Sequence, residues 1–105
     1  MWTIFKIGVD FLDKQNLLDG VKTIHFIGIG GSGMCPLAEI LFNEGYKITG
    51  SDVAESDTLE RIRSYGIPVT MGHYPENVEG ADLIVYTAAV KLDNPELVAA
   101  KHLGI

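Results

Sequence analysis

The sequence has 105 residues, the size of one domain, and its 8 basic and 14 acidic side chains give a formal net charge of −6 at pH 7. This balance argues against nucleic-acid binding, because phosphate backbones are held by clustered Lys and Arg and the basic residues here are scattered. The single cysteine, Cys35, excludes a disulfide framework and a cysteine-rich zinc site, which fits a reducing compartment such as the cytoplasm. No apolar run reaches the roughly 18 residues of a membrane span, and residues 1–11 lack a signal-peptide cleavage pattern.

From residue 22 onward, short apolar runs alternate with amphipathic stretches, which predicts β-α-β units and a parallel sheet. The first strand is expected over residues 23–27, because this nearly continuous apolar run is typical of a strand covered on both faces. A helix is expected from residue 33 or 34 to residue 44, with Pro36 tolerated in its first turn and Gly45 as its stop.

The next segment predicts a second strand over residues 46–50 and a third over residues 68–71. Between them, the D-x-x-E pattern of Asp57 and Glu60 predicts the start of a helix that Gly66 ends. Residues 72–80 are polar and rich in turn formers, so we expect at most one helical turn there.

The last segment predicts a fourth strand over residues 82–87 and a final helix that opens at Asn94-Pro95-Glu96. Asn94 is a suitable cap, Pro95 needs no N–H at the first helical position, and Glu96 lies near the positive helix end. The apolar side chains that we expect this helix to turn inward are Leu97, Val98 and Leu103.

These elements predict an α/β fold, a three-layer Rossmann-like parallel sheet in the order 3-2-1-4 over residues 22–105. The chain ends where a fifth strand would begin, so we expect a truncated domain with an unpaired edge on the fourth strand. Residues 1–21 form a leader of uncertain order. Within it, residues 2–9 alternate weakly and can pair with a sheet edge, and residues 13–18 can form a helical turn or two.

The run Gly28-Ile29-Gly30-Gly31-Ser32-Gly33 satisfies G-x-G-x-x-G directly after an expected strand and directly before an expected helix. The first glycine permits a tight turn, the second lets the main chain approach a diphosphate, and the third lets helix and strand pack. Because no Lys or Arg lies between Lys22 and Lys47, the sequence predicts a diphosphate held by backbone N–H groups and the helix dipole. The alternative is a glycine-rich turn that serves packing alone.

Asp52 follows the glycine pattern by about 20 residues, at the end of the second strand, where an acid accepts ribose hydroxyl groups in dinucleotide-binding folds. A helix cap or a solvated turn acid is the alternative, and Ser51 is a plausible second polar contact. His73 and the small residues Thr87, Ala88 and Ala89 follow the third and fourth strands, so they belong to the same rim.

Other reactive side chains are weaker candidates. His25 lies inside a strand and favours a hydrogen-bonded core histidine, and His102 favours a solvated helix position. Cys35 near a helix start can have a lowered thiol pKa, but a small buried apolar residue is the simpler interpretation. No histidine pair has the spacing of a zinc site.

Longer runs of the chain go beyond the generic glycine pattern. They are Ile24-His25-Phe26-Ile27-Gly28-Ile29-Gly30-Gly31-Ser32-Gly33-Met34, Leu37-Ala38-Glu39, Gly45-Tyr46-Lys47, Gly50-Ser51-Asp52, Gly72-His73 and Asp93-Asn94-Pro95-Glu96. With these runs, residues 22–105 resemble the amino-terminal domain of the Mur ligase family of peptidoglycan synthesis, in particular the members that add L-alanine to UDP-N-acetylmuramate. The departures are Ser32, where the family often has alanine, and Cys35-Pro36, which replace commoner small residues.

The resemblance implies that the domain binds the UDP part of UDP-N-acetylmuramate, with the amides of Gly30 to Gly33 on the diphosphate. The positions that it assigns to the nucleotide are Gly28, Ile29, Gly30, Gly31, Ser32, Gly33, Met34, Ser51, Asp52, His73, Thr87, Ala88 and Ala89. For the complete ligase it implies that ATP activates the muramoyl carboxylate as an acyl phosphate, which L-alanine then attacks, with magnesium stabilising the phosphoryl charge. Since the chain has no G-x-x-x-x-G-K-[ST] pattern, we expect it to bind and not to catalyse, without a cofactor or metal of its own.

Three other functions stay open. A NAD-binding redox or regulatory domain would share the glycine loop and Asp52. A sister ligase that attaches preformed peptide to UDP-N-acetylmuramate has a similar opening. An interaction module would retain the loop without a ligand. The extended run over residues 24–34, together with G-S-D and D-N-P-E, favours the UDP-sugar.

Overall fold

A computed structural model describes residues 2–3 and 19–105 of the chain. In this part of the chain, five parallel strands form one sheet in the order β1-β5-β2-β3-β4. The strands are β1 (Trp2–Thr3), β2 (Thr23–Ile27), β3 (Lys47–Asp52), β4 (Val69–Met71) and β5 (Leu83–Tyr86). The expected order 3-2-1-4 corresponds to β4-β3-β2-β5 and is confirmed.

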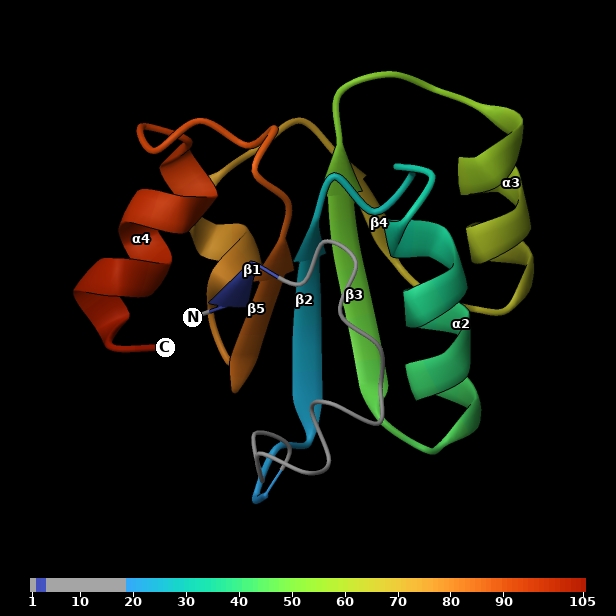
Figure 1. The fold of residues 1–105 in the computed structure, drawn as a ribbon, viewed down its shortest axis with the longest axis horizontal. Coiled ribbons are helices and arrows are strands. Elements are labelled where there is room, and N and C mark those ends of the chain that lie inside the picture. Colours follow the sequence, from blue (N-terminus) through green and yellow to red (C-terminus); the bar gives the residue numbers. More distant parts are fainter. Residues whose placement is uncertain (1, 4–18) are drawn as a thin grey trace.

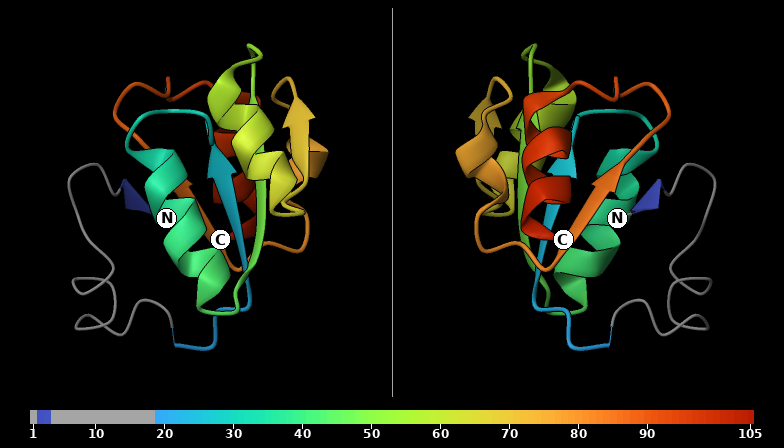
Figure 2. Two further views of the ribbon diagram at one scale, coloured as in Figure 1. Left: turned by 90° about the vertical axis from the view of Figure 1, so that its right-hand side faces the viewer. Right: turned by 90° about the vertical axis from the view of Figure 1, so that its left-hand side faces the viewer.

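Helices cover both faces of the sheet and give the expected three layers (Figures 1 and 2). On one face lie α2 (Met34–Asn43) and α3 (Asp57–Ser64); on the other lie the short 3-10 helix η1 (Pro75–Val78) and α4 (Pro95–Leu103). None of the helices in the described ranges has the length and apolar character needed to cross a membrane.

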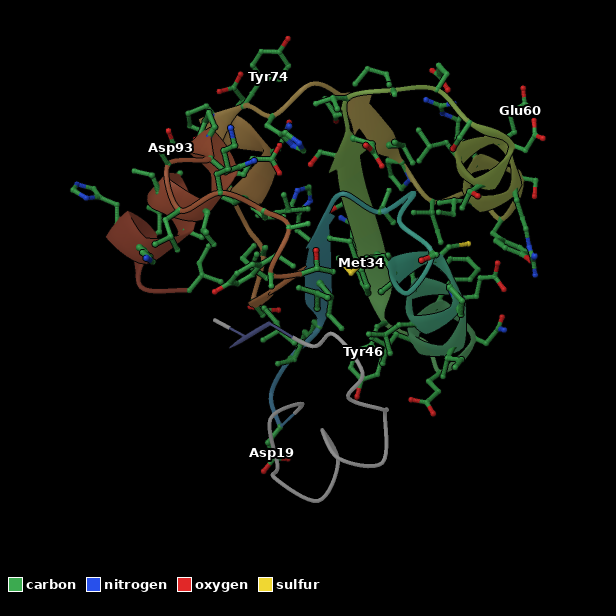
Figure 3. All side chains as sticks on the ribbon, turned by 45° about the horizontal axis from the view of Figure 1, so that its top comes forward. Asp19, Met34, Tyr46, Glu60, Tyr74 and Asp93 are labelled. Carbon is green, nitrogen blue, oxygen red and sulfur yellow. The ribbon has the colours of Figure 1, made fainter. Side chains whose placement is uncertain are left out.

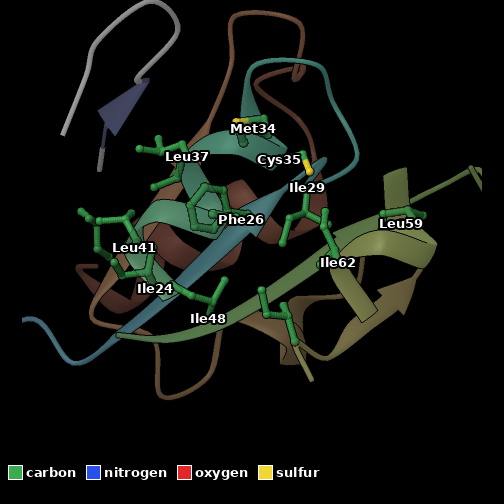
Figure 4. Close-up of a cluster of buried hydrophobic side chains, with 14 residues drawn as sticks. Ile24, Phe26, Ile29, Met34, Cys35, Leu37, Leu41, Ile48, Leu59 and Ile62 are labelled. Carbon is green, nitrogen blue, oxygen red and sulfur yellow. The ribbon is translucent and has the colours of Figure 1, made fainter. Parts of the chain in front are cut away.

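The alternation of side chains along β2 divides the apolar core into two clusters. Ile24 and Phe26 face α2 and α3, where they pack with Leu41 and Ile62 (Figure 4). Ile27 faces the opposite way and packs with Leu97 of α4 and with Val78 and Ile84. This arrangement holds β2 at the centre of the sheet, so the loop that follows it emerges between the two helical layers.

The outer edge of β5 is paired, contrary to the expectation of an open edge. Trp2 pairs in parallel with Val85, and Thr3 pairs with Tyr86. The expected pairing of the leader with a sheet edge is therefore confirmed for these two residues. The helical turn expected over residues 13–18 lies outside the described residues.

One helix start differs from its sequence pattern, and another agrees with it. Ser56, one residue before Asp57, caps α3, because its hydroxyl oxygen accepts the amide of Leu59 at 3.2 Å. Asn94 caps α4 as expected and accepts the amides of Glu96 and Leu97.

The inward face of α4 is smaller than expected. Leu97 is buried, but Val98 and Leu103 are 51% and 58% exposed, so the expectation that they face the core is wrong. Glu96 lies in the first turn of α4 as expected, and its side chain is fully buried. A polar side chain therefore replaces part of the apolar stripe of this helix.

Candidate functional site

A cavity of about 870 Å³ opens at the carboxyl ends of the strands, the usual ligand position in open α/β sheets. Figure 3 tilts this end of the sheet toward the viewer, with Met34 at the start of α2 and Asp93 in the segment that leads into α4. The residues that line the cavity are Ile27, Gly28, Gly31, Ser32, Gly33, Met34, Asp52, Val53, His73, Thr87, Ala88, Ala89, Val90, Lys91, Asp93, Asn94 and Pro95.

The glycine loop is held to β3 by its own backbone. Gly28 has a φ of +78°, a conformation that residues other than glycine rarely adopt. This glycine turns the chain sharply after β2. The amides of Gly28 and Ile29 both donate to the carbonyl oxygen of Ser51, at 2.8 and 3.1 Å. The amide of Gly30 donates to Oδ2 of Asp52 at 2.9 Å. The first half of the loop therefore uses its donors to anchor itself.

The second half of the loop has donors to spare. The amide of Gly31 donates to the carbonyl of Gly28, and those of Met34 and Cys35 donate to the carbonyl of Gly31. Between them, the amides of Ser32 and Gly33 have no acceptor among residues 2–3 and 19–105. These two N–H groups border the cavity at the start of α2. They are the backbone donors of the loop that a bound anion can use.

The glycines of the loop differ in what surrounds them. A Cβ atom at Gly30 would lie 2.7 Å from Oδ2 of Asp52 and 3.0 Å from Cδ2 of Leu59, whereas a Cβ atom at Gly33 would meet nothing within 4 Å. The glycine at position 30 is therefore required by packing against β3 and α3. The glycine at position 33 leaves open space beside the cavity.

Asp52 both faces the cavity and supports the loop. Its Oδ2 accepts the amide of Gly30, and its Oδ1 accepts the amide of Val53 at 2.8 Å. Each carboxylate oxygen has a second lone pair, so these bonds leave acceptor capacity toward the cavity. The two roles considered from sequence, ligand contact and turn acid, are compatible at this position.

The segment between β5 and α4 forms one wall of the cavity. Thr87, Ala88 and Ala89 line it as expected, and Val90 and Lys91 extend the wall. Lys91 forms no ion pair within the described part of the chain. A cation therefore lies on the cavity wall beyond the glycine loop, and the expectation that main-chain dipoles alone hold a diphosphate stays a prediction.

Glu96 is the centre of a buried polar cluster beneath the cavity. Its Oε1 accepts Nε2 of His25 at 2.6 Å and the hydroxyl of Ser51 at 2.7 Å. Its Oε2 accepts Nδ2 of Asn77 at 2.8 Å and the amide of Tyr74 at 3.1 Å. Burial opposes ionisation of Glu96, but the hydrogen bonds from His25, Asn77 and Ser51 outweigh it and lower the pKa of the carboxyl to about 2.

The three histidines have different surroundings. His25 is buried, with its Nδ1 2.7 Å from Oγ1 of Thr49, so it is the hydrogen-bonded core histidine that its strand position indicates. His73 lines the cavity and lies with its Nδ1 2.9 Å from Oγ of Ser51. His102 is exposed on α4.

Cys35 is a buried residue and not an activated thiol. Burial, followed by the hydrogen bond to Glu39, raises the pKa of its thiol to about 11. In the ranges that the structure describes, no group of three or more His, Cys, Asp or Glu residues is placed to hold a metal ion.

The cavity brings together most of the residues expected from sequence but leaves out three of them. Ile29 and Ser51 are fully buried, and neither they nor Gly30 line the cavity. The lining residues that the sequence reasoning missed are Ile27, Val53, Val90, Lys91, Asp93, Asn94 and Pro95. Their position at the carboxyl ends of β2, β3 and β5 or in the connection from β5 to the start of α4 was the available signal, because ligands bind beyond the carboxyl ends of parallel strands.

Comparison with known proteins gives consistent matches. A family model described as "Mur ligase family, catalytic domain" matches residues 23–105. The chain is 60% identical over 85 residues to a UDP-N-acetylmuramate–L-alanine ligase of Sulfurihydrogenibium sp., covering 81% of this chain and 19% of that protein. It is 58% identical over 85 residues to the enzyme of the same name from Legionella pneumophila, covering 81% and 18%.

Solved structures agree with these matches. The UDP-N-acetylmuramate-alanine ligase of Thermotoga maritima matches with a TM-score of 0.76 and 39% identity, over 81% of this chain and 20% of that one. The UDP-N-acetylmuramate:L-alanyl-gamma-D-glutamyl-meso-diaminopimelate ligase of Neisseria meningitides matches with a TM-score of 0.74 and 30% identity, over 81% and 27%. The chain spans about a fifth of the length of the curated relatives it matches.

Proposed function

The chain belongs to the Mur ligase family, and from this premise we propose that its cavity binds the uridine diphosphate part of UDP-N-acetylmuramate. In this proposal, the longer protein that contains such a domain adds L-alanine to that nucleotide sugar in an ATP-dependent reaction of peptidoglycan synthesis. Among the solved structures, 39% identity to the alanine ligase against 30% to the ligase named for a peptide supports the choice of acceptor.

The observation that carries the proposal is the pair of amides at Ser32 and Gly33, which have no acceptor in the described part of the chain. Both border the cavity at the N-terminus of α2, where the helix dipole adds to their attraction for an anion. Lys91, on the segment between β5 and α4, also lines the cavity and adds a positive charge. In the proposal, a diphosphate held there receives hydrogen bonds from the loop amides and is attracted by this side-chain cation.

The remaining lining residues suit the nucleoside and the sugar. Asp52 offers carboxylate oxygens to ribose hydroxyl groups, and Val53 offers apolar surface beside it. Thr87, Ala88 and Ala89 are small, so a ligand can lie close to the backbone of the opposite wall. The proposal leaves Ile29 and Gly30 as supports of the loop.

ATP, magnesium and L-alanine are assigned to other parts of the longer protein. The chain has no G-x-x-x-x-G-K-[ST] cradle for ATP phosphates, and its described residues offer no cluster that fits a metal ion. We therefore derive no catalytic step from these residues, and propose that the chain alone binds the nucleotide sugar without turning it over.

Titration of the 105-residue chain tests this proposal. Backbone amide NMR signals are followed while UDP-N-acetylmuramate, UDP, NADH and ATP are added in separate experiments. We expect UDP and UDP-N-acetylmuramate to shift the amide signals of Ser32, Gly33 and Lys91, with the tighter binding for the larger ligand. Shifts caused by NADH alone would indicate a redox or regulatory domain, and no shift with any of the four would indicate an interaction module; either result overturns the proposal.

A second measurement distinguishes a ligase that uses L-alanine as the acceptor from one that uses a preformed peptide. In the full-length protein, ATP hydrolysis in the presence of UDP-N-acetylmuramate is measured with L-alanine or with a preformed peptide as the acceptor. We expect turnover with L-alanine. Turnover with the peptide alone would assign the protein to the sister activity while leaving the binding proposal intact.

A further inference from the structure

The buried cluster around Glu96 meets the cavity at one side chain, His73. The side chain of Glu96 is fully buried, while that of His73 is 18% exposed and lines the cavity. Nδ1 of His73 lies 2.9 Å from Oγ of Ser51 and 3.4 Å from Oε2 of Glu96. The ring is therefore held through one nitrogen, and its Nε2 has no hydrogen-bond partner among the residues that the structure describes.

The hydrogen-bond directions in the cluster identify the protonated nitrogen of His73. Glu96 is an ionised acceptor, so the hydroxyl of Ser51 donates its only proton to Oε1 of Glu96. Oγ of Ser51 can then only accept from Nδ1 of His73. The nearby Oε2 of Glu96 favours the same arrangement, because it is also an acceptor. Nδ1 carries the proton, and in the neutral ring Nε2 is left as an acceptor.

From this geometry we infer that Ser51 and Glu96 are positioning residues, which fix the His73 ring so that Nε2 accepts a hydrogen bond from an N–H or O–H group of the bound nucleotide. The inference rests on the proposed function and deepens it. It assigns His73 to a donor group of the nucleoside or sugar and leaves the phosphates to Ser32, Gly33 and Lys91. It also gives Ser51 an indirect role in place of the ligand contact expected from its sequence position.

The same cluster contains its own control. His25 also donates to Glu96 through Nε2, and its Nδ1 is paired with the hydroxyl of Thr49 at 2.7 Å. The hydroxyl of Thr49 contacts Nδ1 of His25 in the same way as the hydroxyl of Ser51 contacts Nδ1 of His73. However, neither Thr49 nor His25 lines the cavity. Removal of either hydroxyl perturbs the hydrogen bonds around Glu96. Only the removal of the Ser51 hydroxyl also changes a histidine that lines the cavity, so Thr49 provides the control.

The first test needs no ligand. Long-range proton–nitrogen NMR spectra of the imidazole rings distinguish a protonated ring nitrogen from an unprotonated one. For His73 in the native chain we expect a protonated Nδ1 and an unprotonated Nε2. Ser51→Ala should move the His73 ring toward the Nε2–H tautomer, whereas Thr49→Ala should leave the His73 signals unchanged. A native His73 with its proton on Nε2 would overturn the inference.

The second test measures binding of UDP-N-acetylmuramate by calorimetry. We expect Ser51→Ala to weaken binding about three- to tenfold, the range for one lost hydrogen bond, and Thr49→Ala to change it less than twofold. In a His73→Phe background, Ser51→Ala should have no further effect, because Ser51 acts through His73. An undiminished Ser51→Ala effect in that background would contradict positioning. Absence of binding to the native chain would refute the proposed function, while the tautomer measurement would still decide the orientation of His73.

Discussion

The carboxylate of Asp52 accepts the backbone N–H of Gly30 across the gap between β3 and the glycine loop, with Oδ2 2.9 Å from the amide nitrogen. The acid that dinucleotide-binding folds use for ribose thus also fixes the shape of the loop. No space remains between the two residues, since a Cβ atom at position 30 would lie 2.7 Å from the same Oδ2. Loop shape and the proposed nucleoside contact therefore depend on the same side chain.

Gly30→Ala should destabilise the fold. The added methyl group collides with Asp52 and with Leu59, which is fully buried, so either the loop or α3 has to move. Overpacking of this kind costs about 1–3 kcal/mol. Urea denaturation of the variant measures the loss, and an unchanged midpoint would show that the loop relaxes without strain.

Gly33→Ala should weaken ligand binding and leave the stability of the fold nearly unchanged. Its backbone has φ −89° and ψ −17°, which alanine adopts, and nothing lies within 4 Å of the added Cβ. We expect stability to change by less than about 1 kcal/mol, while binding of UDP weakens because a methyl group now stands beside the cavity. Denaturation and calorimetry on the same preparation check both parts, and unimpaired binding would place the diphosphate away from this amide.

Lys91→Met should weaken UDP binding and reduce its dependence on salt. Lys91 is exposed, so its interaction with a bound phosphate is screened and is worth about 1 kcal/mol or less, or up to about fivefold in affinity. Lys101→Met is the matched control, because Lys101 is exposed on α4 and does not line the cavity. Calorimetry at low and high salt compares the two, and equal behaviour would mean that Lys91 does not contact the ligand.

Acid should destabilise the chain through Glu96. Its pKa is lowered from 4.5 to about 2 in the folded state, so its contribution is present above about pH 4.5 and is lost as the pH falls toward 2. The shift corresponds to about 3 kcal/mol. Glu96→Gln should flatten the pH dependence of the unfolding free energy in this window, and Glu76→Gln, at an exposed position, should not. A native-like acid profile in Glu96→Gln would refute this assignment.

Cys35 should be unreactive in the native state. Burial, and then the hydrogen bond to Glu39, hold the pKa of the thiol at about 11, so almost none of it is thiolate at pH 8. Alkylation followed by mass spectrometry should be slow for the folded chain and fast in denaturant. Glu39→Gln should accelerate it only modestly, since burial is the larger cause; rapid labelling of the native chain would contradict the buried position.

The strands were predictable because their residues follow simple local rules. The apolar runs that become β2 and β5 are buried on both faces, and the glycine pattern lies between β2 and α2, where the sequence places it. Strand order followed from short right-handed connections. The cap of α3 was missed by one residue, because Ser56 and Asp57 are both good caps and only the backbone decides between them.

The deeper part of the site was not predictable from local patterns. Glu96 follows Asn94-Pro95 at a helix start, where an acid normally faces solvent, and only the packing of α4 against β2 and β3 brings it to His25 and Ser51. Val98 and Leu103 were misjudged for the same reason, since the helix turns Glu96 inward and leaves them exposed. Ser51 was expected to contact the ligand, but its side chain is buried and donates to Glu96 beneath the cavity.

The connection between β5 and α4 supplies the cavity wall from Thr87 to Lys91 and also Asp93 and Asn94, and α4 adds Pro95, whereas the strands themselves supply only Ile27 and Asp52. Most of the cavity lining therefore lies outside the strands, while two lining residues, Asp52 and Asn94, also support the fold. A library that randomises residues 88–92 should yield many folded chains with altered ligand selectivity, because none of these side chains is fully buried. In this sense, the residues of this connection can be replaced while the sheet and helices keep their structure.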